Sequence, residues 1–231
     1  MMTRHSTEKY TCPHCKKNFQ FTKWQSINVT LSPILEERMF DKSLFTEICP
    51  TCKKSIFINY DYLYHDMENK ILIQHVTNEK SLDTAYKLFS HQDELISQEL
   101  SYDDDYIIRI VGNYNELVEK LDIFNCGYDD RIIEMCKIFI LNSFYESTPE
   151  IDLKKNTIEI YFGGDDENDI FGIFVNEELV STSDFSQELY DELEETYIDI
   201  LDREDAHELI VSEAWAVNFL AKHTDATFEE L

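Results

Sequence analysis

The residues most able to do chemistry are four cysteines in two copies of one short motif. The segment CPHCKKNF occupies residues 12–19, and CPTCKKSI repeats it at residues 49–56. Each copy holds a Cys-x-x-Cys pair, and 33 residues separate the two pairs. A two-residue gap lets both sulfurs of a tight turn point at one ion, so two such turns supply a closed tetrahedral site. The spacing therefore predicts one metal site with four sulfur ligands: Cys12, Cys15, Cys49 and Cys52.

The residues around the cysteines support this prediction. Pro13 and Pro50 fix φ inside the two turns and so reduce the entropy lost when the sulfurs converge. Zn²⁺ is favoured by softness and geometry, although Fe²⁺ can occupy the same ligands. Because four protein ligands leave no open coordination position, the metal is expected to hold structure rather than to perform chemistry. The negative charge of four thiolates around one ion is offset by the lysines that follow each turn: Lys16, Lys17, Lys53 and Lys54.

The alternative chemistry for a Cys-x-x-Cys pair is a thioredoxin-like dithiol, which needs only one pair in a βαβ setting. No such setting surrounds either pair, and the repeat extends beyond the cysteines to the proline and the lysines. His14 lies inside the first turn, but with four sulfurs available it is expected to be exposed rather than a ligand. The metal site is therefore the favoured interpretation.

The other reactive side chains are interpreted as structural. Cys126 lies in a Gly-containing turn, and Cys136 lies on the apolar face of a predicted helix, where buried thiols are usually inert. Neither is expected to take part in metal binding or catalysis. His65, with Asp66 beside it, is expected to be a turn histidine with a satisfied side chain.

Three carboxylates near the start of a predicted helix could form a cluster: Asp129, Asp130 and Glu134. We favour the simpler interpretation, in which they cap the helix, complement its dipole and pair with Arg131. The chain has no Walker loop, no Gly-rich dinucleotide turn, no His-Glu-x-x-His and no Gly-x-Ser-x-Gly motif. No catalytic residue is assigned, and no motif indicates an enzyme.

Charge divides the chain into two parts. Of the 231 residues, 43% are hydrophobic, which is ample for a core, and the net charge is -27. Residues 1–80 carry a net charge of +2, whereas residues 81–231 carry -29. This break predicts a zinc-binding domain at 1–78 and an acidic α+β domain at 79–231, in which 79–104 is a connector with a possible helix.

The predicted fold class is α+β: a small two-knuckle zinc ribbon-like module, then an acidic lobe with a short antiparallel sheet and packed helices. In the first module, strands are expected near 18–30, 55–60 and 70–76, with a helix opened by Ser32 and Pro33. The second module is expected to hold these elements: a strand at 106–111, helices opened by Asn113, Asp129, Asp184 and Ser212, and a hairpin of 157–162 with 169–176.

Three segments of the sequence resemble a known protein family. CPHCKKNFQFTKWQSINVTLSPIL and LFTEICPTCKKSIFINYDYLYHDM are similar to the CpXC family, named for its Cys-Pro-x-Cys motifs. The segment IIRIVGNYNELVEKLDIFNCGYDDRIIEMCKIFI is similar to the stretch that commonly follows that domain. The resemblance implies a bacterial protein with a zinc ribbon-like domain, and it carries metal binding to the same four cysteines. In one departure from the family pattern, Lys16 and Lys53 stand where a glycine usually follows the knuckle.

Two classes of function fit these observations. The first is a non-enzymatic interaction or regulatory protein, in which the zinc module is structural and the acidic lobe meets a basic protein partner. The second is a nucleic-acid-binding zinc ribbon, for which Lys23 and Trp24 could extend a small basic and aromatic patch. The net charge of -27 argues against a polyanionic partner. The chain shows neither an apolar run long enough to span a membrane nor an apolar signal segment, so we expect a cytoplasmic protein.

Overall fold

The computed structural model describes residues 2–90, 106–149, 151, 155–164 and 168–223. Over these residues the chain is α+β, as predicted, with six helices and three sheets. It divides into two compact units, Met1–Leu117 and Val118–Leu231, which we describe separately. The domain boundary after residue 78 stays a prediction. Among the described helices, none combines the length and the apolar character needed to cross a membrane.

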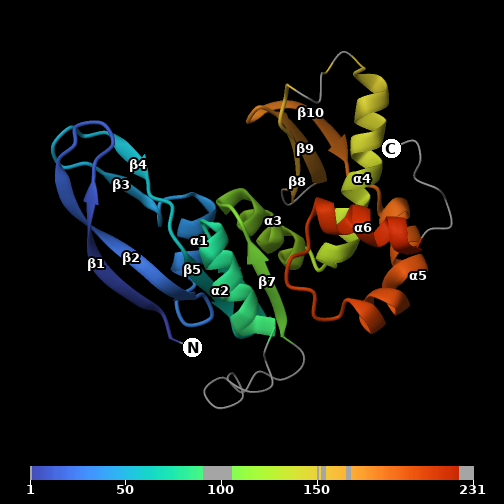
Figure 1. Cartoon of the computed structure of the whole chain (residues 1–231), viewed down its shortest axis with the longest axis horizontal. Helices are drawn as coiled ribbons and strands as arrows, with labels where there is room; N and C mark the ends of the chain where they lie inside the picture. Colours follow the sequence, from blue (N-terminus) through green and yellow to red (C-terminus); the bar gives the residue numbers. More distant parts are fainter. Residues whose placement is uncertain (1, 91–105, 150, 152–154, 165–167, 224–231) are drawn as a thin grey trace. The chain divides into compact units, whose positions relative to one another are not determined.

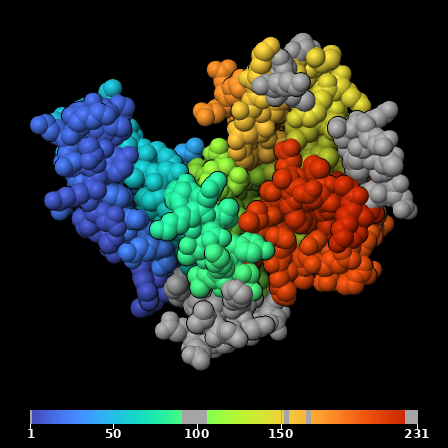
Figure 2. Space-filling model, viewed as in Figure 1, coloured from blue at the N-terminus to red at the C-terminus, as the bar shows by residue number. Residues whose placement is uncertain are grey.

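The first unit is built on a mixed five-stranded sheet with the strand order β1-β2-β5-β6-β7 (Figure 1). Antiparallel pairs β1–β2 and β5–β6 alternate with parallel pairs β2–β5 and β6–β7. The edge strand β1 is largely exposed and appears in blue in Figure 2. The strands are β1 (Arg4–Thr11), β2 (Asn18–Asn28), β5 (Tyr62–Asp66), β6 (Ile71–His75) and β7 (Ile107–Val111).

A separate antiparallel pair, β3 (Thr46–Ile48) and β4 (Ser55–Phe57), completes the strands of this unit. Helix α1 (Ile34–Phe40) precedes this pair, and its N-cap residue is Pro33 rather than the predicted Ser32. Helix α2 (Glu79–Ser90) is the helix foreseen within the connector, and it contacts β7. The rest of the predicted connector, residues 91–104, lies outside the described residues.

The second unit contains an antiparallel sheet of three strands in the order β10-β9-β8. The predicted hairpin is confirmed as β8 (Ile158–Gly164) and β9 (Asp169–Val175), while residues 165–167 of its loop lie outside the described part of the chain. The third strand, β10 (Glu178–Asp184), was not predicted. The helices of this unit are the last turns of α3 (Tyr114–Asn125), then α4 (Asp130–Ser147), α5 (Gln187–Glu204) and α6 (Glu213–His223).

The face of this sheet that belongs to the core is filled by two rows of side chains. Ile160 opposes Ile173 and Phe162 opposes Phe171, and all four are buried together with residues of α4, α5 and α6. Directly opposed residues of antiparallel strands share one face of the sheet. On β10 the next position in each row is a serine, because Ser181 opposes Ile173 and Ser183 opposes Phe171.

Most of the predicted helix starts are confirmed by their hydrogen bonds. Asn113 and Glu116 form the expected capping box at α3, where the Glu116 N–H donates to Asn113 Oδ1 at 2.9 Å and Asn113 Nδ2 donates to Glu116 Oε1 at 2.8 Å. Asp129 caps α4, because its Oδ1 accepts from the Arg131 N–H at 2.8 Å. Helix α5 differs from its prediction, since the hydroxyl of Ser186, not the Asp184 carboxylate, accepts from its first turn.

Helix α4 buries charged side chains as well as its apolar face. Asp130 and Glu134 were expected to complement the helix dipole. Instead, both belong to a buried ion cluster with Lys120 of α3. Lys120 Nζ lies 3.0 Å from Asp130 Oδ2 and 2.9 Å from Glu134 Oε1. Lys137 Nζ lies 2.6 Å from Glu119 Oε1 and 3.2 Å from Glu134 Oε2. The side chains of all five residues are at most 4% exposed.

Burial and attraction oppose each other in this cluster. Burial raises the pKa of Glu119 to about 7, because the nearby Lys137 offsets only part of the desolvation. For Glu134 burial acts in the same sense, but Lys120 and Lys137 outweigh it, and the pKa of this carboxyl is lowered. The cluster therefore depends on its two lysines, since an unpaired carboxylate in the core is costly.

We expect Lys137→Met to lower the free energy of unfolding of the second unit by about 3 kcal/mol, because it leaves Glu119 and Glu134 short of a cation while keeping the side chain's bulk. The measurement is urea unfolding followed by Trp215 fluorescence in a Trp24→Phe background. The matched control is Lys222→Met, because the Lys222 side chain is 66% exposed and its Nζ atom lies 2.7 Å from Glu204 Oε2. That change should cost less than about 1 kcal/mol. Equal losses in the two variants would contradict the role given to the cluster.

Candidate metal centre

Each Cys-x-x-Cys pair lies in the loop of an antiparallel hairpin. The first loop joins β1 to β2, and the second joins β3 to β4. The ladder pairs that close the two loops are Thr11 with Asn18 and Ile48 with Ser55. Both loops therefore have the same length and begin with a cysteine at the same position. This is the arrangement of a zinc ribbon-like knuckle module.

The backbone of the two loops is hydrogen-bonded in the same way. In the first, the Cys12 N–H donates to the Lys17 carbonyl and the Lys16 N–H donates to the Cys12 carbonyl, both at 3.0 Å. The Cys15 N–H also points at Cys12 Sγ, at 3.4 Å. These bonds fix the turn and so hold two sulfurs on one side of it. The second loop repeats the two backbone bonds at 2.9 Å, from Cys49 to Lys54 and from Lys53 to Cys49.

The fourth residue after each leading cysteine adopts a left-handed backbone. Lys16 has φ 61° and Lys53 has φ 60°, in the region that favours glycine. These two lysines therefore occupy a backbone conformation that suits the glycine of the family pattern. Both lysines are exposed, and each carries a small cost in backbone energy.

The two loops bring all four sulfurs together. The Sγ atoms of Cys12 and Cys52 are 3.7 Å apart, and those of Cys15 and Cys49 are also 3.7 Å apart. All four lie within 4.8 Å of one another. A disulfide would need about 2.05 Å, so these are free thiols. A tetrahedron with metal–sulfur bonds of about 2.3 Å has edges of about 3.8 Å, which fits the two separations of 3.7 Å.

The electrostatics of the group also suit a cation. Burial acts to raise the pKa of Cys12, but the N–H groups of Cys15 and His14 outweigh it and lower that pKa to about 6. At Cys15 the Lys17 amide favours the thiolate, but burial and the neighbouring thiols raise the pKa to about 11. Sulfurs this close oppose one another's ionisation, because like charges repel. A divalent ion at their centre would remove that conflict.

The other reactive side chains of the sequence analysis lie apart from this group. His14 is exposed and is not one of the clustered ligands. Cys126 is exposed beside Gly127, with its Sγ 3.7 Å from Asp169 Oδ1. Cys136 is buried on α4, and burial raises the pKa of its thiol to about 12.

His65 differs from its prediction in one respect. It lies in strand β5, not in a turn, and is almost fully buried. Its Nε2 atom is 3.0 Å from the Tyr106 hydroxyl, so the side chain is satisfied as expected. Asp66 beside it accepts hydrogen bonds from Thr30 and Asn69 instead of orienting the imidazole ring. The strand β5 was not predicted, because the polar residues of DYLYHD are typical of a connecting segment.

Replacing the left-handed lysines should stabilise the first unit. We expect Lys16→Gly and Lys53→Gly each to raise its free energy of unfolding by up to about 1 kcal/mol, because glycine removes the steric cost of positive φ. Urea unfolding followed by Trp24 fluorescence in a Trp215→Phe background measures the change.

The matched controls are Lys17→Gly and Lys54→Gly, one residue along, which remove the same charge from a backbone without positive φ. There glycine should destabilise the unit by about 0.5 to 1 kcal/mol, since it adds freedom to the unfolded chain. The same sign at both positions would show that charge, not backbone conformation, decides the effect.

Comparison with known proteins agrees with the geometry. A family model described as "CpXC protein" matches residues 10–137, more than half of the chain. The match includes both knuckles and continues into α4. No curated protein and no solved structure matches the chain. The residues matched and the four-sulfur group at their start show that this chain belongs to the CpXC protein family.

Proposed function

We propose that this protein is a non-enzymatic interaction protein whose first unit is held together by one structural Zn²⁺. The observation that carries the metal is the group of four sulfurs from two equal hairpin loops, with cross-loop separations of 3.7 Å. Four sulfur donors in a tetrahedron favour zinc over harder cations. With four protein ligands the ion has no open position, so its contribution is to cross-link the two hairpins.

Charge supports the interaction part of the proposal. Residues 118–231 contain 30 acidic and seven basic residues. Three of the basic side chains are buried in ion pairs inside this unit: Lys120, Arg131 and Lys137. Three carboxylates, those of Glu119, Asp130 and Glu134, are buried with them, so the net charge of -23 is carried by the other residues of this unit. Such a field raises the association rate of basic partners and repels nucleic acid.

The metal proposal predicts about one zinc ion per chain, measured by elemental analysis of the purified protein. The double variant Cys12→Ser/Cys49→Ser removes one sulfur from each loop and should lose the metal. Its matched control is Cys126→Ala/Cys136→Ala, which changes two cysteines outside the sulfur group and should keep it. Full occupancy in the first variant, or an equal loss in the second, would overturn the assignment.

The interaction proposal predicts a basic partner that binds at low salt and is released at high salt. Neutralising four acidic residues of α5, by changing Asp191, Glu192, Glu194 and Glu195 to Asn or Gln, should weaken the capture of that partner several-fold. Pull-downs with wild-type and variant protein at two salt concentrations provide the measurement.

The control neutralises four acidic residues of the first unit: Glu8, Glu37, Glu68 and Glu79. It removes the same charge from the molecule but leaves the second unit unchanged. If both variants lose the partner equally, net charge and not the acidic unit attracts it. If neither salt nor either variant matters, the acidic surface has no binding role.

A further inference from the structure

We propose that the edge of β10 and the neighbouring face of α4 form a docking groove for an extended, basic peptide, which pairs with β10 as a fourth strand. This inference rests on the proposed interaction function and names the surface and the partner chemistry.

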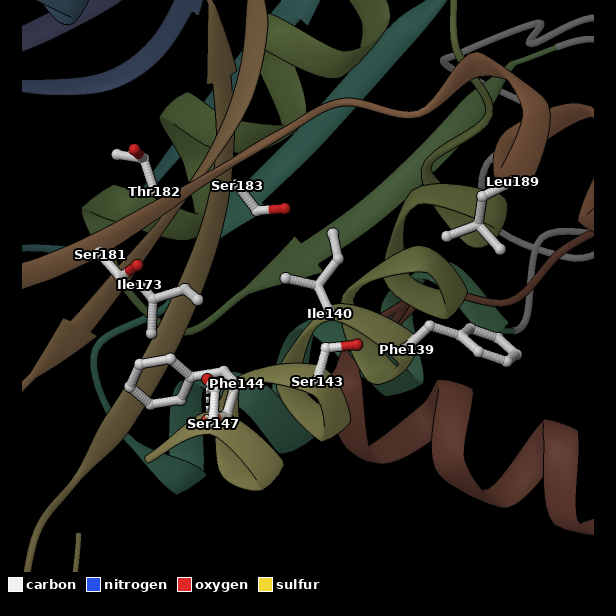
Figure 3. A pocket seen from close by; sticks show the side chains of 10 residues that line it. All are labelled: Phe139, Ile140, Ser143, Phe144, Ser147, Ile173, Ser181, Thr182, Ser183 and Leu189. Carbon is white, nitrogen blue, oxygen red and sulfur yellow. Dashed lines mark hydrogen bonds between the residues drawn. The ribbon is translucent and has the colours of Figure 1, made fainter. Parts of the chain in front are cut away.

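A groove opens where two serines of β10 replace large side chains. Ser181 and Ser183 lie on the same face as Ile173 and Phe171, but a serine side chain is too short to fill the layer between sheet and helix. The result is a cavity of about 270 Å³ between β10 and α4, which also reaches Leu189 of α5. Figure 3 shows Ser183 from the strand and Ile140 from the helix directed into this space.

The groove has an apolar floor and a rim of hydroxyl groups. The floor includes Phe139, which is 42% exposed, together with Ile140 and Phe144. Ser143 of α4 and Thr182 of β10 contribute hydroxyls, as do the two serines of β10. Exposed aromatic and aliphatic surface beside adaptable hydroxyl groups suits an apolar side chain carried on a polar backbone.

The strand beside the groove has an open edge. In the sheet order β10-β9-β8, the described part of the chain gives β10 a ladder partner on one side only. Edge strands are usually guarded by a lysine, a proline or an inward-pointing charge. The centre of this edge, Ser181–Ser183, has none of these. A bulge after Leu179 interrupts the ladder, so the regular edge is the part that borders the groove.

A strand added at this edge would complete both rows of side chains. Adjacent strands lie about 4.8 Å apart, and alternate residues of the new strand would project on the face of Ser181 and Ser183. Those residues would cover the cavity and contact the exposed part of Phe139. Main-chain hydrogen bonds would supply affinity and the cavity would select an apolar side chain, as in other cases of strand addition.

Charge selects a basic occupant. Glu178 and Asp184 flank the edge of β10, Glu188 precedes Leu189, and Glu146 lies on α4 within the stretch that lines the groove. All four side chains are exposed, and among the described residues no lysine or arginine lines the cavity. A second copy of this chain carries a net charge of -27, and residues 224–231 contain three acidic residues and no basic one. Both are repelled, whereas lysines between the apolar residues of a peptide are attracted.

Fluorescence anisotropy with the full chain tests the groove, using an eight-residue peptide that alternates lysine with valine. A peptide that alternates glutamate with valine should bind at least about tenfold more weakly. Two N-methylated versions of the lysine peptide separate strand pairing from adsorption by charge. Methyl groups on the amides of one alternate set should abolish binding, and those on the other set should not, because only one set faces β10.

Protein variants locate the site. Ser143→Phe fills the cavity from an exposed position of α4 and should weaken binding at least about tenfold, whereas Thr196→Phe on the exposed face of α5 should not change it. Equal binding of the two N-methylated peptides would contradict the docking groove, and so would equal binding by the two protein variants. Either result would leave the proposed function intact, because a basic partner could still bind in a salt-dependent way elsewhere.

Two further outcomes would also contradict the proposal that a basic peptide occupies the groove. One is a self-associated wild-type chain that Ser143→Phe dissociates, seen by analytical ultracentrifugation, since the occupant would then be a second copy. The other is a gain of tenfold or more in peptide affinity when the chain ends at His223, since the occupant would then be the chain's own residues 224–231.

Discussion

Negative charge that leaves water needs a cation beside it, and both units of this protein are organised around that requirement. In the first unit, four thiols converge to separations as short as 3.7 Å, which only a metal ion can balance once they ionise. In the second, Glu119, Asp130 and Glu134 are buried around the ammonium groups of Lys120 and Lys137. A bound metal ion would supply the cation in the first unit, whereas the chain itself supplies the cations in the second.

The internal solution commits cations of a unit that has few of them. Lys120, Arg131 and Lys137 are among the few basic residues of the second unit, and each is committed to carboxylates inside it. The exposed cations Arg203 and Lys222 both approach Glu204. The remaining acidic side chains therefore face solvent with little compensation. Because the three buried cations are matched by three buried carboxylates, the interior removes equal numbers of both signs and leaves the acidic excess to the other residues.

Local signals in the sequence predicted local structure well. The Asn113 capping box and the Asp129 cap each depend on residues within a few positions of one another, and the structure agrees with them. The two Cys-x-x-Cys pairs lie 33 residues apart, but the repeated motif still predicted that their sulfurs come together. The wrong caps of α1 and α5 were local errors of one or two residues, whereas two other failures involved distant partners. Strand β10 lacks strong alternation, and it becomes a strand by pairing with β9. Nothing near Glu134 in sequence reveals Lys120, which approaches only when α3 packs on α4.

The two hairpin loops are related by an approximate local twofold axis. Exchanging the loops exchanges Cys12 with Cys49 and Cys15 with Cys52, so the two cross-loop contacts map onto each other, and they have the same length of 3.7 Å. A tetrahedron itself contains twofold axes, so two copies of one turn can supply its four corners without any further arrangement. One repeated eight-residue motif is therefore enough to supply all four ligands. The symmetry ends beyond the loops, because the β1–β2 ladder is long and the β3–β4 ladder is short.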